Sequence, residues 1–325
     1  MTTTIDFSKL LDLIKGEEGF LLTSHQDPDG DSIGSLIGLN RLLKGLGKKT
    51  VIFNQGRLPE KYDFLDPAGE IKFAPERIDF EPAVAFVLEC PNIERIGFVL
   101  DLLKAQMIIV NIDHHTSNTL FGALNYIDED ACAVAEILLN MIRAGGFKIT
   151  PQIAEPFYAA IASDTGRFKF PNTDANCFRS AAELVEAGAN PKLISDKIFS
   201  SFSAGTMKLL GHMLNNLELY DAGKICVLKL TLDDLRRFDV KVEDTEGIID
   251  YSLIIAGVKV GILFKEFNPN TIKIGLRSQN GVDISRYAKT KGGGGHPNAA
   301  GFTLNDRFDR AVKRTVDEVA EYLDA

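Results

Sequence analysis

The chain has 325 residues, of which 45% are hydrophobic and 25% are charged, and its formal net charge is −9. This length is too great for one ordinary hydrophobic core, so we expect two domains. An acidic chain lacks the basic footprint of a general nucleic-acid binder, which argues against a long nucleic acid as ligand. A short phosphate-bearing ligand held at one local site agrees with this charge.

The sequence gives no sign of membrane attachment or secretion. No apolar run has the length of a membrane-spanning helix, and the first residues lack the basic and apolar regions of a signal peptide. The four cysteines are far apart and form no CxxC pair; they are Cys90, Cys132, Cys177 and Cys226. We therefore expect reduced thiols in a cytoplasmic protein.

The first half of the chain alternates short apolar runs with segments of helical period. The expected strands are residues 20–24, 50–54, 83–88 and 107–112. The expected helices are residues 32–46, 93–103, 131–144, 153–163 and 175–187. Alternation of this kind predicts an α/β domain with a parallel sheet and helices on both faces, which we assign to residues 1–190.

The pattern changes in the second half. Residues 191–200 and 206–217 have helical character, so residues 191–217 are expected to form a helical linker. The strands expected after it are residues 224–230, 258–266 and 271–277. A glycine-rich loop and a final helix at 307–323 follow them. We expect residues 218–325 to form a smaller α/β domain.

The first polar motif directly follows the first expected strand. It reads His25-Gln26-Asp27-Pro28-Asp29-Gly30-Asp31, and its turn residues allow His25, Asp29 and Asp31 to converge. The alternative is an acidic loop that only caps the next helix, with Asp31 or Ser32 as the N-cap.

Further candidate ligands follow the third and fourth expected strands. These are Glu89 and the triplet Asp113-His114-His115. Ligand sites in open α/β sheets form at the carboxyl ends of the strands, where these residues fall. A further carboxylate, Asp164, follows an apolar helix. Imidazoles with several carboxylates suit Mn²⁺ or a similar ion, and paired ions of that type hydrolyse phosphate esters. A purely structural histidine pair, and Asp164 as a helix cap, are the alternatives.

The glycine run at 292–295 precedes His296 in the second expected domain. A glycine backbone can approach an anion closely and donate its N–H groups, and His296 would add a donor. Arg277 ends an alternating strand and could hold a phosphate. The alternatives are a flexible loop and an ordinary surface arginine.

Taken in order, these motifs resemble the DHH phosphoesterase superfamily, most closely soluble DHH–DHHA1 proteins of the NrnA type. The resemblance covers most of the chain, from about Phe20 to Phe302. It rests on the His-x-Asp-Pro-Asp-Gly-Asp-x-x-Gly-Ser segment at 25–35, the segment around Glu89, Asp-His-His, Ser-Asp-Thr-Gly, and the glycine run with its His-x-x-Ala-Ala-Gly continuation.

The resemblance implies a bifunctional phosphoesterase. Such proteins convert short oligoribonucleotides to mononucleotides and 3′-phosphoadenosine 5′-phosphate (pAp) to AMP, using two Mn²⁺ ions that Mg²⁺ or Co²⁺ could replace. A homodimer is a possible assembly. The alternatives are hydrolysis of cyclic di-AMP or linear pApA, and a nucleotide sensor with weakened catalysis.

The resemblance also implies residue roles. His25, Asp29 and Asp164 would hold one ion, Asp31 and His114 the other, and Glu89 would bridge them. His115 and Asp113 would act in catalysis. The residues implied for substrate binding are Arg277, Ser278, Gly293, Gly294, Gly295 and His296. One position departs from the family pattern, because Glu89 stands where these proteins usually carry aspartate.

Overall fold

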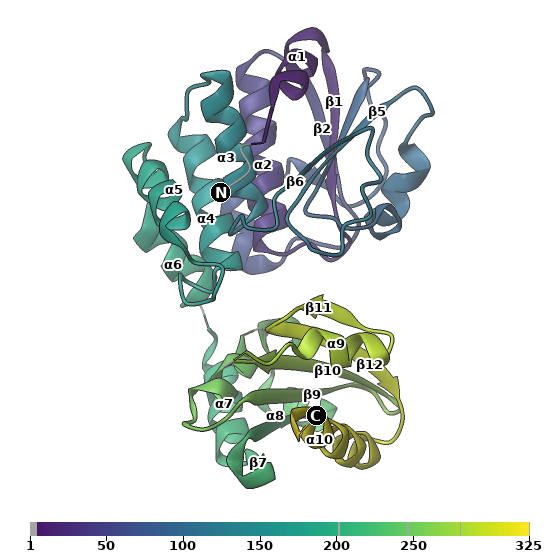
Figure 1. Ribbon diagram of the computed structural model, residues 1–325, viewed down its shortest axis with the longest axis vertical. Helices are drawn as coiled ribbons and strands as arrows, with labels where there is room; N and C mark the ends of the chain where they lie inside the picture. Colours follow the sequence, from purple (N-terminus) through teal and green to yellow (C-terminus); the bar gives the residue numbers. More distant parts are fainter. Residues whose placement is uncertain (1–4, 201, 246, 280, 325) are drawn as a thin grey trace. The chain divides into compact units, whose positions relative to one another are not determined.

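The protein is described by a computed structural model that covers residues 5–200, 202–245, 247–279 and 281–324. The chain forms two compact units, Met1–Ser201 and Phe202–Ala325 (Figure 1). No helix in the described ranges is long and apolar enough to cross a membrane.

The first unit is built on a parallel sheet with strand order β3-β2-β1-β4-β5-β6. Its strands are β1 (Gly19–Ser24), β2 (Lys49–Phe53), β3 (Ile71–Lys72), β4 (Val84–Leu88), β5 (Ile108–Asp113) and β6 (Leu124–Ile127). Its helices are α1 (Ser8–Gly16), α2 (Gly30–Gly45), α3 (Val134–Gly145), α4 (Pro151–Asp164), α5 (Ala175–Glu186), α6 (Pro191–Phe199), and the 3₁₀ helices η1 (Glu60–Leu65) and η2 (Ile93–Leu102). The expected parallel α/β fold is confirmed.

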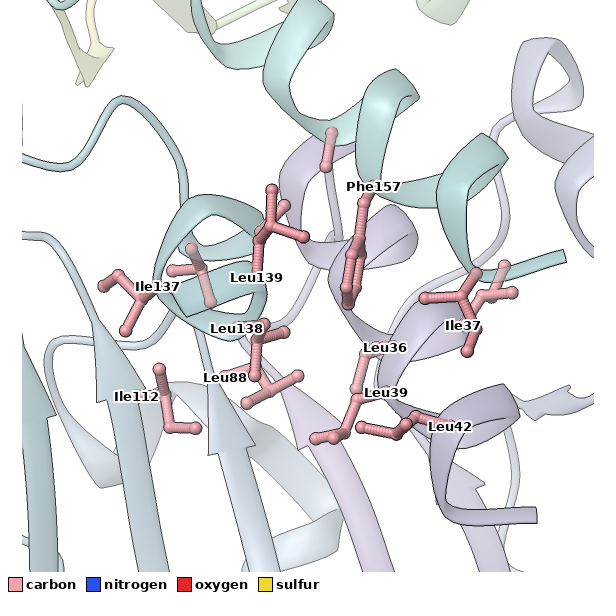
Figure 2. Close-up of a cluster of buried hydrophobic side chains, with 14 of the residues drawn as sticks. Leu36, Ile37, Leu39, Leu42, Leu88, Ile112, Ile137, Leu138, Leu139 and Phe157 are labelled. Atoms are coloured by element: carbon pink, nitrogen blue, oxygen red, sulfur yellow. The ribbon is translucent and has the colours of Figure 1, made fainter. Parts of the chain in front are cut away.

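The two faces of this sheet are covered by different helices, because alternate strand residues point to opposite sides. Leu22 and Leu88 join the larger core beneath α2, α3 and α4. Figure 2 shows part of this core, which includes Leu36, Leu138 and Phe157 of those helices and Leu88 of β4. Leu21 and other residues on the opposite face of the sheet pack against η2 in a smaller cluster. Burial on both faces explains why the central strands read as continuous apolar runs.

Close packing of α2 against α4 determines where their ends lie. A Cβ added at Gly34 would lie 2.3 Å from the carbonyl oxygen of Pro156, and one at Gly38 would lie 2.1 Å from the ring of Phe157. At the start of α2, a Cβ on Gly30 would lie 2.3 Å from the Oγ of Ser163. The helices are therefore antiparallel, and the first turn of α2 lies beside the last turn of α4.

The second unit contains a mixed sheet with strand order β11-β12-β10-β9-β8-β7, in which β8 and β9 pair in parallel and the other neighbours pair antiparallel. Its strands are β7 (Glu218–Tyr220), β8 (Ile225–Leu230), β9 (Val260–Asn268), β10 (Thr271–Ser278), β11 (Gly294–His296) and β12 (Ala299–Asn305). Its helices are α7 (Ala204–Asn215), η3 (Asp221–Gly223), α8 (Leu232–Phe238), η4 (Val242–Thr245), η5 (Ile248–Ile254), α9 (Ile284–Thr290) and α10 (Phe308–Asp324). The expected smaller α/β unit is thus present.

The glycine run differs from the simple flexible loop that was one alternative. Gly294–His296 form the short strand β11, which pairs antiparallel with β12. Gly293 is packed so closely that an added Cβ would lie 2.1 Å from the carbonyl oxygen of Gly301. The glycines therefore allow close strand packing rather than disorder.

Candidate metal centre

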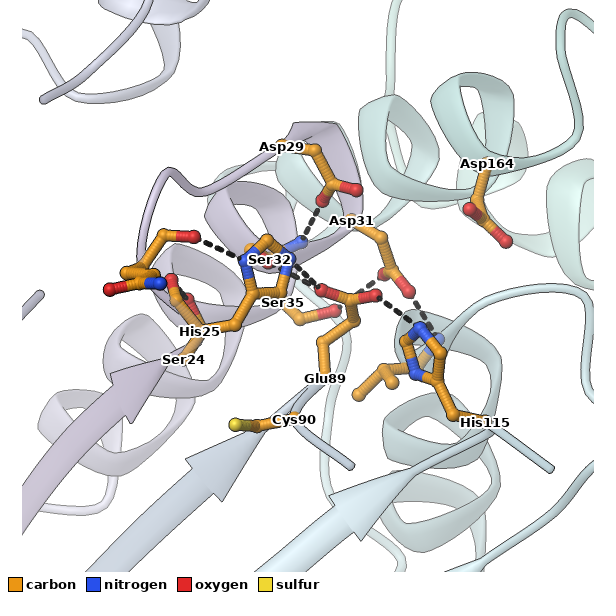
Figure 3. Close-up of polar contacts among 12 residues, drawn as sticks. Ser24, His25, Asp29, Asp31, Ser32, Ser35, Glu89, Cys90, His115 and Asp164 are labelled. Atoms are coloured by element: carbon orange, nitrogen blue, oxygen red, sulfur yellow. Dashed lines mark hydrogen bonds and ion pairs between the residues drawn. The ribbon is translucent and has the colours of Figure 1, made fainter. Parts of the chain in front are cut away.

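The polar residues expected at the strand ends converge in the first unit. His25 follows β1, Glu89 follows β4, and His114 and His115 follow β5. Figure 3 shows the side chains of His25, Asp31 and Glu89 gathered at this edge of the sheet. His25, Asp31, Glu89 and His114 are all nearly inaccessible to solvent. Burial of so many ionisable groups requires mutual pairing or a metal.

Asp29 begins α2 as its N-cap. Its carboxylate accepts a hydrogen bond from the backbone N–H of Ser32 at 3.0 Å. The alternative of a purely capping loop named Asp31 or Ser32 as the N-cap, and the structure has Asp29 in that position instead. The physical reason is that Asp31 is already inside the first turn, where its side chain points toward α3 instead.

Asp31 is fixed by three donors. Its carboxylate accepts hydrogen bonds from the hydroxyl of Ser35 at 2.9 Å and from the backbone N–H groups of Val134 and Ala135 at 2.6 and 3.3 Å. Burial raises the pKa of Asp31 to about 6, although the imidazole of His114 acts in the opposite direction. The carboxylate is therefore held at the start of α3 before any ion arrives.

Glu89 contacts groups from three other segments. Its Oε2 lies 2.6 Å from the Nε2 of His25 and accepts a hydrogen bond of 2.6 Å from the hydroxyl of Ser32, while its Oε1 lies 3.7 Å from the Nε2 of His115. Burial disfavours its charged form, but the nearby imidazoles outweigh burial and lower its pKa. Its φ of 50° is unusual for a residue with a side chain and indicates local backbone strain.

Two histidines favour the protonated form in the absence of a metal. Burial disfavours imidazolium at His25, but the carboxylates of Glu89 and Asp29 raise its pKa to about 9. At His114 burial is likewise outweighed, chiefly by Asp164 and Asp31, and the pKa rises to about 9. Each Nδ1 lies near a backbone carbonyl oxygen, that of Gln26 at 2.7 Å for His25 and that of Ala131 at 3.0 Å for His114. Each Nε2 is thereby directed toward the carboxylates.

His115 is oriented by a buried chain of polar groups. Its Nδ1 donates to Asp113 at 2.7 Å, and the other oxygen of Asp113 accepts from Asn118 at 2.6 Å. Asn118 also donates to the side-chain oxygen of Asn111 at 2.8 Å, and Asn111 donates to the carbonyl oxygens of Val87 and Cys90. Asp113 is completely buried. The imidazole therefore presents its Nε2 toward Glu89.

The candidate ligands form two groups whose donor atoms lie within 4.8 Å of one another: His25, Asp29 and Glu89, and Asp31, His114 and Asp164. Both groups combine imidazole nitrogen with carboxylate oxygen, which fits Mn²⁺ and similar divalent ions. The grouping differs from the expected division, since Asp164 lies with Asp31 and His114. The antiparallel packing of α2 and α4 explains this placement, because Asp164 is the last residue of α4.

The carboxyl group of Asp164 has a strongly shifted pKa. Burial, opposed by His114 but reinforced by Asp31, raises its pKa to about 8. Its Oδ2 lies 3.3 Å from the side-chain nitrogen of Asn172, which also donates to the carbonyl oxygens of Cys132 and Asp164 itself. Several buried carboxylates at short range cannot all carry their charge without a compensating cation.

The residues expected to bind substrate lie in the second unit. Arg277, near the end of β10, donates from Nε to Asp250 at 3.1 Å. The hydroxyl of Ser278 is buried and donates to the carbonyl oxygen of Val282 at 2.6 Å, so it holds the following loop. His296 is exposed at the end of β11. At Gly294 an added Cβ would meet no atom within 4 Å, unlike at Gly293 and Gly295.

Comparison with known proteins identifies the chain. The family model described as "DHH family, N-terminal domain" matches residues 20–161, and the "DHHA1 domain" model matches residues 222–325. The bifunctional oligoribonuclease and PAP phosphatase NrnA of Thermus thermophilus is 30% identical over 96% of this chain and 93% of its own length. The chain belongs to the DHH–DHHA1 family.

Further comparisons with this DHH–DHHA1 protein give another relative and two solved structures that share its fold. The Bacillus subtilis protein of the same name is 28% identical over 94% of this chain and 96% of its own length. An exopolyphosphatase-related protein from Bacteroides fragilis shares the fold, with a TM-score of 0.90 and 24% identity over 98% of this chain and 97% of that chain. A RecJ from Thermus thermophilus in complex with Mn²⁺ matches at a TM-score of 0.56 and 14% identity, over 99% of this chain and 56% of that chain.

Sequence reasoning missed several polar residues of this centre, among them Ser32, Asn118 and Asn172. Ser32 contacts Glu89, Asn118 contacts Asp113, and Asn172 contacts Asp164. Ser32 and Asn118 each lie within three residues of a motif, which is a usable signal. Asn172 lies eight residues beyond Asp164, and only the turn after α4 brings the two together.

Proposed function

We propose that this chain is a divalent-metal-dependent phosphoesterase that hydrolyses short oligoribonucleotides to mononucleotides and pAp to AMP. One observation carries the proposal: two adjoining groups of imidazole and carboxylate ligands in a buried site of a DHH–DHHA1 protein. The names of the full-length relatives support the two substrates. The buried, unbridged cysteines agree with a cytoplasmic protein.

His25, Asp29 and Glu89 would hold one ion, and Asp31, His114 and Asp164 the other. Mn²⁺ is the ion we propose, since it accepts both oxygen and imidazole ligands, and Mg²⁺ or Co²⁺ would be substitutes. When bound, such a pair of ions activates water for attack on phosphorus and offsets the charge that develops on the phosphoryl oxygens.

The remaining residues of this centre contact the substrate or position other side chains. His115 lies beside the ligand groups, with its Nδ1 held by Asp113. Its Nε2 is therefore positioned to contact a phosphoryl oxygen of the substrate. Asp113 is a positioning residue, because it contacts the imidazole and lies completely buried. Ser32 and Ser35 fix Glu89 and Asp31 respectively.

The second unit would supply the nucleotide-binding groups. Arg277 offers a guanidinium for a phosphate, and His296 and the backbone of Gly293, Gly294 and Gly295 offer further donors. Ser278 would contribute by holding the loop that follows β10. We assign the catalytic domain to residues 1–190, the linker to residues 191–217 and the substrate-binding domain to residues 218–325.

A hydrolysis panel tests this function. Purified protein is stripped of metal, reloaded with Mn²⁺, Mg²⁺ or Co²⁺, and assayed with pAp, pApA, a five-nucleotide RNA, cyclic di-AMP and pyrophosphate. The proposal expects release of AMP from pAp and of mononucleotides from RNA, with no turnover after chelation. Turnover of cyclic di-AMP or pyrophosphate alone would contradict it.

A further inference from the structure

An exposed aromatic and basic surface lies next to the metal centre, in a part of the chain that neither family model covers. The models match residues 20–161 and 222–325. Between them, Phe168 stacks against Phe178 with ring centroids 5.5 Å apart and an interplanar angle of 21°. Phe178 is 55% exposed. One large exposed side chain needs no explanation by itself, but Phe178 is held in place by a half-buried aromatic partner, Phe168, which packs against the core.

Cationic residues are next to both rings in the sequence. Arg167, Lys169 and Arg179 are all exposed, and the guanidinium of Arg167 lies over the ring of Phe199, 4.9 Å from its centroid. In the part of the chain that the structure describes, neither Arg167 nor Lys169 forms an ion pair with a carboxylate. We call Arg167, Phe168, Lys169, Phe178 and Arg179 the aromatic-basic surface. A local positive surface on a chain of net charge −9 indicates an anionic ligand.

The backbone that presents this surface is strained. Gly166, Arg167 and Phe168 are consecutive residues with φ of 55°, 65° and 63°. Positive φ values of this size are unfavourable for residues with a side chain, above all for a bulky phenylalanine. Strained backbone persists only where its surroundings fix it, and it concentrates at functional sites.

Buried Thr165 fixes the strained turn. Its hydroxyl donates to the carbonyl oxygen of Ile161 at 2.6 Å and accepts from the N–H of Phe168 at 3.1 Å. Its carbonyl oxygen accepts from the N–H groups of Lys169 and Phe170. The turn starts directly after the metal-ligand candidate Asp164 and returns to it through Asn172. The turn that carries Arg167, Phe168 and Lys169 is therefore fixed directly beside the candidate ligand Asp164.

We propose that the aromatic-basic surface is a subsite for the RNA nucleotides beyond the one being cleaved. A base would stack on the open face of Phe178, and Arg167 and Lys169 would contact the adjoining phosphates. Aromatic rings bind single-stranded bases without sequence preference, and arginine supplies paired donors to phosphate. This inference rests on the proposed RNA hydrolysis, and it names how chains longer than a dinucleotide are held.

The experiment compares substrate lengths. Phe178→Ala should lower kcat/KM for a five-nucleotide RNA by about tenfold, mainly through KM, as expected for the loss of one stacked base. Hydrolysis of pAp, which has no second base, should stay within about twofold of the wild type. Phe178→Tyr keeps the ring and should retain RNA turnover. Arg167→Ala should show the same dependence on length.

Phe267→Ala is the matched control. Phe267 is 50% exposed and lies at the end of β9, opposite the end that pairs with Arg277. It should leave both substrates unchanged. Equal losses on RNA and pAp in Phe178→Ala would indicate a structural effect and overturn the subsite, as would unchanged RNA kinetics.

A measurement of RNA binding distinguishes failure of this inference from failure of the proposed function. If the wild type hydrolyses no RNA, the proposed function fails, and the subsite is then judged by fluorescence anisotropy of a labelled five-nucleotide RNA on the metal-free protein. Weaker binding in Phe178→Ala than in Phe267→Ala supports the surface. Equal affinities overturn it.

Discussion

Asp113 holds the imidazole of His115 by a hydrogen bond of 2.7 Å from Nδ1, and His114 is the one residue between them in the sequence. The turn after β5 directs the imidazoles of His114 and His115 to different carboxylates. The Nε2 of His114 lies 3.8 Å from Asp164, and the Nε2 of His115 lies 3.7 Å from Glu89. Their rings lie nearly perpendicular, at 87°. A three-residue motif thereby places one imidazole in a ligand group and the other at its border.

Asp113→Asn should reduce kcat by at least about tenfold with a smaller change in KM, because an amide no longer fixes the tautomer and orientation of His115. Steady-state kinetics with pAp measures this. Asp130→Asn, an exposed aspartate from the same unit, is the control and should be neutral. A wild-type kcat in Asp113→Asn would remove the positioning role.

Binding of Mn²⁺ should release protons at neutral pH. The pKa values of His25 and His114 are about 9 without metal, and a ligand imidazole must be neutral. Apparent affinity should therefore rise as pH increases toward about 9. Isothermal titration calorimetry in buffers of different ionisation enthalpy measures the released protons. An affinity equal at pH about 6.5 and about 8.5 would contradict the assignment.

Without metal, the folded protein should lose stability as the solution becomes alkaline. His25 and His114 have pKa values raised from 6.5 to about 9, and Asp164 has a pKa raised from 3.8 to about 8. Groups with a raised folded-state pKa stabilise below their unfolded value, and this stabilisation disappears as pH passes the folded value. Because the pKa of Glu89 is lowered, its contribution to stability changes only in acid solution and not in this alkaline range.

Thermal unfolding in a chelator should thus show a lower Tm at pH about 9.5 than at pH about 6.5. Saturating Mn²⁺ should remove much of that difference, because it binds the deprotonated ligands of the folded state. A Tm of the metal-free protein that rises across this window would show that the paired groups do not titrate as described.

Gly293→Ala and Gly294→Ala should separate structure from binding. An alanine methyl at position 293 meets the carbonyl oxygen of Gly301, so Tm should fall. At position 294 the methyl meets open space, so Tm should hold while KM rises if substrate approaches the backbone there. Differential scanning fluorimetry and kinetics with pAp give both values. Unchanged KM in Gly294→Ala would argue against this approach.

Glu89→Asp tests the departure from the usual family residue. If the protein is an enzyme as it stands, shortening the side chain breaks its 2.6 Å contacts with His25 and Ser32 and should lower kcat severalfold. A large gain from nearly no activity would instead indicate a nucleotide sensor. Turnover of pAp by both proteins at matched Mn²⁺ occupancy provides the comparison.

Much of the first unit could be predicted because its strands are buried on both faces and form continuous apolar runs, while its helices carry apolar residues at helical spacing. The metal-centre residues could be located because each motif follows a strand end, as at His25 and Glu89. Their division between two groups was not predictable, since it depends on the approach of α4 to α2. The strand at Gly294–His296 also escaped prediction, because a glycine run carries no β propensity and its pairing with β12 is a tertiary effect.

The glycines of α2 give this centre a particular vulnerability. Gly34 and Gly38 are not candidate ligands, yet Gly34 makes room for the backbone of α4 at Pro156 and Gly38 makes room for the ring of Phe157. A methyl group at either position would act as a wedge, tilting α4 and drawing the carboxylate of Asp164 away from Asp31. Loss of activity would thus arise from positions about one and two helical turns beyond Asp31, in variants whose chemical groups are all intact.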